Sequence, residues 1–260
     1  MIDPFTDKFE IQKRRELAKL MEDWKKVVST KSDIIFPDDG KEYRTVDYFY
    51  SDGFYPGYFS SNPKVLFFAR EARWASGKDR ILSDLECLKT PNDASYWRRI
   101  MYMTYGIQTK GKYKFSELPS ADEIYANMKE KNNYGFAIMN ISKYSNDSDS
   151  GGTADYNLIN RFLVDSELDK RNFIREEIAL LDPDVIISAN LWGGSINYKE
   201  FCKFFPEHEF KIIDRIENKA NLSDFKFNGK TIKFIDTFHF SAIGSDEDLY
   251  YNPVMKFLFG

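Results

Sequence analysis

Polar side chains follow four apolar segments of this chain, at the points where each segment is expected to end as a strand. The last segment, residues 231–236, is followed by His239, one of only two histidines, and by Ser241. Ligands bind outside the carboxyl ends of strands in an open parallel sheet, so we expect chemistry at this edge. The alternative is that His239 is a satisfied structural group, as a lone histidine often is. The three earlier segments are followed by Arg70 and Glu71, by Asn140 and Lys143, and by Asn190.

Motifs that would assign a phosphate, a nucleophile or a metal to this edge are missing. Residues 72–79 contain the Gly-Lys pair of a P-loop, but Ala72 replaces its first Gly and Asp79 its Ser or Thr. No G-x-G-x-x-G follows a strand and no G-x-S-x-G occurs, which argues against a dinucleotide cofactor and a nucleophile elbow. An EF-hand over residues 147–158 is rejected because Leu158 occupies the position of its closing Glu. We therefore expect neither a metal nor an organic cofactor.

The elements that must position these residues alternate between strands and helices. The strand segments are nearly continuous apolar runs, which is typical of the interior of a parallel sheet. We therefore predict an α/β fold, a three-layer α/β/α sandwich around a central, mainly parallel four-stranded sheet. The expected strands cover residues 63–69, 135–140, 184–189 and 231–236, with an outer strand at 210–214, and the expected helices cover 7–29, 78–106, 155–164, 168–181 and 246–259.

An N-terminal extension over residues 1–62 is expected to pack on an α/β domain over residues 63–260. Its helix has apolar residues at helical spacing, which indicates docking by one face, whereas its basic run at residues 13–15 is expected to face solvent. The aromatic segment 48–59 has two interpretations: it forms a stacking lid over a flat ligand, or it packs down onto the domain.

Composition limits the classes of protein to which the chain belongs. Its 260 residues suffice for a sizeable core, and Cys87 and Cys202 form no paired ligand motif, as is usual in a reducing compartment. The 37 basic and 41 acidic residues give a net charge of -4, so no broad nucleic-acid footprint exists. The N-terminus has no signal-peptide pattern and no run is long enough to span a membrane, so we expect a soluble, cytoplasmic protein, and a monomer.

The ordered motifs resemble those of the uracil-DNA glycosylase superfamily over roughly residues 63–258. In that family a first strand leads to a Gly-Glu-Ala-Pro-Gly loop, of which Arg70-Glu-Ala-Arg-Trp74 keeps Glu-Ala. A second strand ends in an Asn that reads the base, as residues 138–140 do here, and a Leu-x-Pro-Asp-Val-Ile opening is matched by residues 181–187. The last strand ends in His-Pro-Ser, matched by His239-Phe-Ser241, with an apolar wedge four residues after the His.

The resemblance implies a role for each residue. Glycosidic hydrolysis passes through a cationic sugar and an anionic base, so His239 is expected to donate to the base and Glu71 to place water. Asn140 is expected to read the edge of an extruded base, with a turn-forming role as the alternative. Ile243 is expected to fill the gap in the base stack, with ordinary core packing as the alternative. The remaining expected substrate-binding residues are Arg70, Lys143, Asn190 and Ser241.

Two departures from the family pattern affect these expectations. The first loop lacks the Gly and Pro that control how closely its backbone approaches a ligand. Phe240 stands where the family has Pro, which is expected to loosen the turn around His239, so that Phe240→Pro raises any activity. DNA binding is expected to depend on a local basic edge made of Arg70, Arg73 and Lys143.

Three hypotheses about function follow. The first is a glycosylase-like protein that binds a nucleobase, within DNA or free, and hydrolyses its N-glycosidic bond in base-excision repair. The second is a catalytically inactive relative that binds a nucleotide or a protein partner. The third is an unrelated α/β hydrolase.

Overall fold

The structure of the chain is a computed structural model. It describes residues 7–29, 34–35, 42–43, 49–72, 85, 87–131, 133–146, 154–167, 170–191 and 202–260. The helices are α1 (Lys8–Val28), α3 (Ser95–Gln108), α4 (Ala121–Lys131), α5 (Tyr156–Ser166), α6 (Phe173–Leu181) and α8 (Asn252–Phe259), with short helical turns η2 (Pro91–Asp93), η3 (Phe115–Glu117), η5 (Glu207–Glu209) and η6 (Glu247–Tyr251). The strands are β1 (Ile34–Ile35), β2 (Glu42–Tyr43), β3 (Gly53–Phe54), β4 (Val65–Ala69), β5 (Ala137–Asn140), β6 (Val185–Ala189), β7 (Phe210–Ile216), β8 (Ala220–Phe227) and β9 (Lys230–Thr237).

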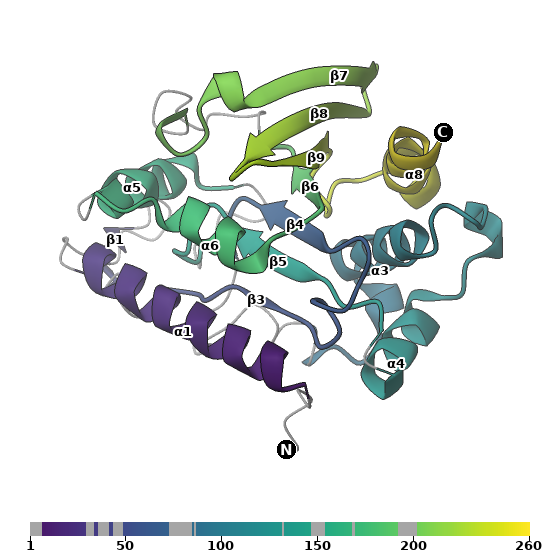
Figure 1. Cartoon of the computed structure of the whole chain (residues 1–260), viewed down its shortest axis with the longest axis horizontal. Helices are drawn as coiled ribbons and strands as arrows, with labels where there is room; N and C mark the ends of the chain where they lie inside the picture. Colours follow the sequence, from purple (N-terminus) through teal and green to yellow (C-terminus); the bar gives the residue numbers. More distant parts are fainter. Residues whose placement is uncertain are drawn as a thin grey trace.

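A mixed sheet forms the centre of the molecule (Figure 1). In the described part of the chain its seven strands have the order β3-β5-β4-β6-β9-β8-β7. β5, β4, β6 and β9 pair in parallel, as predicted. The predicted number of four strands is wrong, because β3 joins one edge antiparallel and the β7–β8 hairpin extends the other.

The register of the parallel strands aligns their carboxyl ends. Ala69 at the end of β4 lies opposite Asn140 at the end of β5, and Ala189 of β6 lies opposite Thr237 of β9. The residues that follow these strands therefore leave the sheet along one edge, as the sequence predicts.

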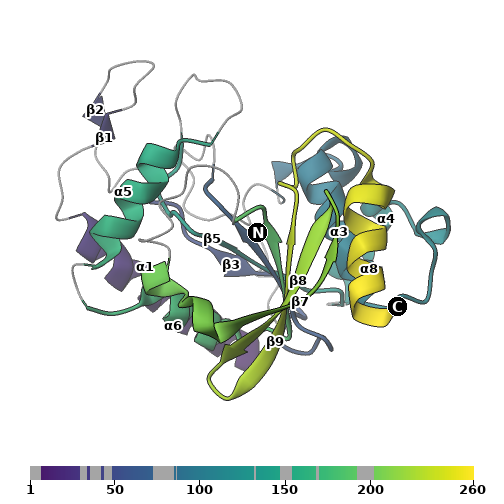
Figure 2. The same ribbon diagram turned by 90° about the horizontal axis from the view of Figure 1, so that it is seen from above.

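Helices cover both faces of the sheet, so the molecule has three layers. α1, α5 and α6 lie on one face and α3, α4 and α8 on the other, as both views show (Figures 1 and 2). Side chains alternate between the two layers along each strand. Leu66 and Phe68 of β4 pack with the α1 layer, whereas Val65, Phe67 and Ala69 pack with the α3 layer.

The N-terminal segment is part of this packing. Asp7 caps α1 by accepting hydrogen bonds from the backbone N–H groups of Phe9 and Glu10, and the buried stripe of α1 faces α5 and α6. The described aromatic residues of the 48–59 segment pack onto the domain, so the interpretation of this segment as a lid over a ligand does not hold for them. Five of their rings are nearly inaccessible: Phe49, Tyr50, Phe54, Tyr55 and Tyr58.

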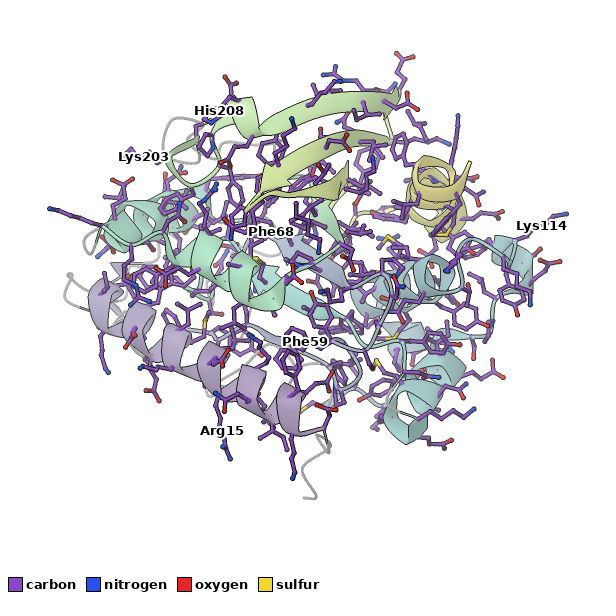
Figure 3. All side chains as sticks on the ribbon, in the orientation of Figure 1. Arg15, Phe59, Phe68, Lys114, Lys203 and His208 are labelled. Carbon is purple, nitrogen blue, oxygen red and sulfur yellow. The ribbon has the colours of Figure 1, made fainter. Side chains whose placement is uncertain are left out.

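Side chains on the solvent side of α1 project outward, and Figure 3 shows Arg15 pointing away from the helix, as expected for a solvated basic run. The expected helix at 78–106 is represented in the described residues by α3, which begins at Ser95 and ends at Gln108. None of the helices described has both the length and the apolar character needed to cross a membrane.

Candidate functional site

The carboxyl edge of the sheet contains a topological switch point. The first two parallel strands along the chain are β4 and β5, but β6 pairs with β4 on the side away from β5. The connections on the two sides of β4 therefore diverge, and in open α/β sheets ligands bind in the crevice at this point. Arg70 and Asn190 follow the two strands that flank it.

Arg70 bridges the two strand ends. Its side chain is 7% exposed, and its Nε and Nη2 donate to the carbonyl oxygen of Asn190 at 3.1 and 2.5 Å. Its Nη1 donates to the hydroxyl of Tyr156 on α5, and the guanidinium carbon lies 5.3 Å from the centre of that ring. Asn190 adopts a left-handed φ of 56°, which Asn tolerates better than most residues. The structure thus brings Arg70 and Asn190 together, and the positive charge of the Arg70 guanidinium is nearly buried.

Asn140 lies at the end of β5 with its side chain 1% exposed. Its backbone N–H donates to Asp52 Oδ2 at 2.9 Å, and its carbonyl accepts from Lys143 Nζ at 2.5 Å. Its side-chain Nδ2, in contrast, is buried and has no hydrogen-bond partner among the residues that the structure describes. Ile138, two residues earlier, belongs to the α3 layer, so strand alternation directs the amide of Asn140 to that face.

Lys143 does not lie on an accessible basic edge, so that prediction is wrong. Its side chain is 0% exposed and pairs with Asp52 and, at 3.0 Å, with Glu177 of α6. Its ammonium also lies 4.6 Å from the Trp24 ring centre of α1. Burial and then the Asp52 charge raise the pKa of Glu177 well above its usual range, despite the opposing effect of Lys143. The lysine is therefore a structural counter-ion that supports the backbone of Asn140, and Arg73, the third residue of the predicted edge, lies outside the described residues.

Glu71 connects segments around the carboxyl edge of the sheet. Its Oε1 accepts hydrogen bonds from Asn146 Nδ2 at 3.1 Å and from the backbone N–H of Asp155 at 3.0 Å. Asp155 is also the N-cap of α5. The carboxylate thus fixes the start of α5 beside the strand ends, and its predicted catalytic role stays a prediction.

His239 is held as a neutral imidazole. Burial, together with the Arg70 and Arg99 charges, lowers the pKa of His239 to about 4. Its Nδ1 accepts a hydrogen bond from the backbone N–H of Ser241 at 3.3 Å, so the ring proton is assigned to Nε2. The ring lies 6.4 Å from that of Tyr96 in the first turn of α3, on the same face as the Asn140 amide. His239 is therefore a hydrogen-bond donor through Nε2 near neutral pH.

The two other predicted residues of this segment are solvent-facing. Ser241 is exposed, and it contributes its backbone N–H to His239. Ile243 is 102% exposed, which rules out the alternative of ordinary core packing. Phe240, which lies between His239 and Ser241, is fully buried against Phe67 and Tyr96, with ring centres 5.6 Å apart in both pairs. The prediction that Phe240 loosens this turn is wrong, because its ring anchors the turn in the α3 layer.

Sequence reasoning missed several residues that position the site. Asp236 at the end of β9 accepts hydrogen bonds from Ser188 Oγ at 2.5 Å and from the backbone N–H of Leu191 at 3.0 Å, which ties β9 to the turn after β6. Asp52 and Arg99 come from segments remote from the strand ends, and their sequence surroundings contain no motif. Only Asp236 could have been noticed from the sequence, because it is an acidic residue in the apolar run of β9.

The described residues contain no group of three or more His, Cys, Asp or Glu side chains arranged to hold a metal ion. No family model matches the chain. No solved structure matches it either. A match does exist among curated proteins: the chain is 22% identical over 166 residues to a leishmanolysin-like peptidase from Caenorhabditis elegans, covering 64% of this chain and 22% of that protein. The chain thus spans about a fifth of the length of this relative.

This match corrects the classification that the strand-end motifs suggested. The matched relative is named a peptidase and not a DNA glycosylase, so the assignment of the chain to DNA-repair glycosylases is overturned. The resemblance of the motifs to the glycosylase superfamily is a separate matter, which none of the comparisons tests. The α/β architecture itself is confirmed.

Proposed function

We propose that the carboxyl edge of β5, β4, β6 and β9 is a binding site for a small planar ligand with an anionic group, of the nucleotide type. The observation that carries this proposal is the buried Nδ2 of Asn140 at the end of β5, which finds no hydrogen-bond acceptor in the described part of the chain. A buried donor without an acceptor costs about 1–3 kcal/mol, and a ligand acceptor at this position would recover that energy. The proposal is confined to binding, because the glycosylase classification is overturned.

Three chemical features support a ligand of this type. The amide of Asn140 both donates and accepts, which suits the edge of a heterocycle. The neutral His239 donates through Nε2 from the same face of the sheet. The Arg70 guanidinium supplies positive charge at the carboxyl edge of the sheet, where its limited exposure to water strengthens its attraction for an anion. Together these groups favour a ligand that combines a flat polar ring with a phosphate.

The test is calorimetric titration with uridine and adenosine 5′-monophosphates, with inorganic phosphate as a separate probe. Changing Asn140→Asp replaces the donor with a carboxylate, and we expect the affinity for the preferred nucleotide to fall about 10-fold or more. Asn127→Asp is the matched control, since Asn127 is half-buried on α4 and its Nδ2 donates to the carbonyl oxygen of Glu123 in the same helix at 3.0 Å. Absence of binding at millimolar nucleotide, or equal affinity in wild type and Asn140→Asp, would contradict the proposal.

Peptidase activity is a second candidate, favoured by the match to the C. elegans protein. A zinc peptidase of the H-E-x-x-H type requires two histidines four residues apart on one helix. The two histidines of this chain are His208 and His239, and Figure 3 shows His208 at the outer margin of the molecule. A peptidase reaction in this chain must therefore use other residues. We expect no chelator-sensitive cleavage of a quenched casein substrate, and cleavage abolished by EDTA would refute this expectation.

A further inference from the structure

The segment between β9 and η6, residues 238–246, carries His239 and Ser241 and is held by one buried side chain from α3. That side chain is Arg99, which is 3% exposed. The segment contains no regular secondary structure before η6 apart from turns. Its conformation therefore depends on contacts with the rest of the molecule.

Arg99 bonds to alternate carbonyl groups of the segment. Its Nη1 donates to the carbonyl oxygens of Phe240 and Ala242 at 2.6 and 2.7 Å, and its Nη2 donates to that of Gly244 at 3.0 Å. Its Nε donates to Asp246 Oδ1 at 2.7 Å, where the segment ends. One guanidinium thus fixes the path of the backbone across seven residues.

The same guanidinium reaches His239 through Tyr250. It lies 4.2 Å from the centre of the Tyr250 ring, and Nη1 donates to the Tyr250 hydroxyl at 3.2 Å. That hydroxyl donates to the carbonyl oxygen of His239 at 2.7 Å. The backbone of His239 is therefore connected to Arg99 by one intervening group.

The geometry requires an arginine. A guanidinium presents five donors in a rigid plane, whereas an ammonium presents three donors at one point and cannot reach carbonyl groups in several directions. Bonds from a charged donor are also stronger than neutral ones, especially where water is excluded. Phe240 contributes an apolar anchor in the same segment, so the turn after β9 is fixed by Arg99 and Phe240 together.

We infer that Arg99 is a positioning residue that holds the 238–246 segment so that His239 faces the ligand site. This inference rests on the proposed binding function, since it assigns Arg99 to the geometry of that site. Arg99 itself touches no ligand, and its effect on binding is transmitted through the backbone of residues 239–244.

The test compares Arg99→Lys with Arg98→Lys. Arg98 is the matched control because its Nε pairs with the other oxygen of Asp246, at 2.6 Å, whereas its Nη1 donates to the carbonyl oxygen of Asn92 and not to a carbonyl group of the 238–246 segment. The first measurement is hydrogen exchange of the Ala242 amide, which donates to the His239 carbonyl at 2.8 Å. We expect Arg99→Lys to speed this exchange about 10-fold or more and Arg98→Lys to change it less than about 3-fold.

The second measurement is the affinity for the nucleotide identified by calorimetry, with Arg99→Lys expected to weaken it about 10-fold. Tyr250→Phe is a milder variant that removes only the link to His239. It replaces Arg99→Lys in the test if Arg99→Lys fails to fold, and we expect it to weaken binding by a smaller factor. Unchanged exchange and affinity in Arg99→Lys overturn the inference, as does unchanged affinity in Tyr250→Phe when Arg99→Lys is unfolded. If the wild type binds no nucleotide, the proposed function fails, and hydrogen exchange still decides whether Arg99 holds the segment.

Discussion

At the scale of single residues, the neutral state of His239 links the site to the stability of the protein. The pKa of His239 is about 4 in the folded chain against an ordinary value of 6.5. As pH falls below 6.5, His239 is protonated in the unfolded chain but stays neutral in the folded chain. The free energy of unfolding therefore decreases between pH 6.5 and 4.

We expect His239→Gln to lose less stability than the wild type on acidification. When His239 is fully protonated in the unfolded chain and still neutral in the folded chain, the free energy of unfolding is lower by about 3 kcal/mol. The measurement is urea unfolding at pH 7.5 and 4.5, with His208→Gln as the control, since His208 is exposed. Equal acid sensitivity in wild type and His239→Gln would show that His239 is not the responsible group.

Phe240 yields a prediction opposite to the one made from the family pattern. Its ring is fully buried, and replacing a buried Phe by a small residue typically costs about 3–5 kcal/mol. We expect Phe240→Pro to lower the free energy of unfolding by about this amount. Phe259→Ala is the control and should change stability by less than about 1 kcal/mol, because that ring is 42% exposed. A stabilised Phe240→Pro variant would restore the original interpretation.

The positions of the polar residues could be predicted, but their environments could not. Arg70, Asn140, Asn190 and His239 do follow the four parallel strands, because apolar runs and their polar ends are visible locally. Lys143 was misplaced because its partners come from other parts of the chain. A buried lysine and an exposed lysine cannot be told apart from the local sequence, because burial depends on residues that are distant along the chain.

At the scale of elements, the ion cluster of Asp52, Lys143 and Glu177 joins β5, α6 and the segment before β3. All three side chains are 0% exposed. Removing one member of such a cluster leaves uncompensated charge in the interior, whereas replacing all members is often nearly neutral.

We therefore expect Lys143→Met to lower the free energy of unfolding by about 3–5 kcal/mol. The triple variant Lys143→Met, Asp52→Asn and Glu177→Gln should recover most of this loss. Lys230→Met is the control, because Lys230 pairs with Asp182 and Asp184 at a side-chain exposure of 33% and should contribute less than about 1 kcal/mol. Urea unfolding measures all three, and a single variant as stable as the wild type would contradict the buried-charge argument.

The hairpin strands show where local patterns were insufficient. β7 was predicted as an outer strand and is confirmed. β8 was missed because it has no continuous apolar run: exposed polar residues such as Asn221 and Lys226 alternate with its buried side chains, which is the pattern of a strand with one solvent face. The Asn228-Gly229 pair joins β8 to β9, and both residues adopt a left-handed φ, of 49° and 77°. A two-residue turn of this kind joins antiparallel strands, so a strand before Asn228 was available from the turn chemistry.

At the scale of the whole molecule, the N-terminal helix closes one face of the sheet. Trp24 is 0% exposed, stacks on Phe173 with ring centres 5.3 Å apart, and donates from Nε1 to Ser166 Oγ at 2.8 Å. Glu10 accepts hydrogen bonds from the backbone N–H groups of Gly57 and Phe59 at 2.9 and 3.0 Å. Trp24 also covers the ammonium of Lys143, so α1 seals the ion cluster from water.

A chain that begins at residue 30 should therefore fail to fold alone. Loss of one buried Trp typically costs about 3–5 kcal/mol, and α1 buries Leu17, Leu20, Met21 and Val28 as well, whereas whole domains are stable by only about 5–15 kcal/mol. We expect the truncated chain to show no cooperative thermal transition, and a synthetic peptide of residues 7–29 added in excess to restore one. A peptide of the same length with Trp24→Ala and Leu20→Ala is the control and should not restore it. A truncated chain that unfolds cooperatively at the wild-type temperature would instead show that residues 63–260 form a core independent of the helix.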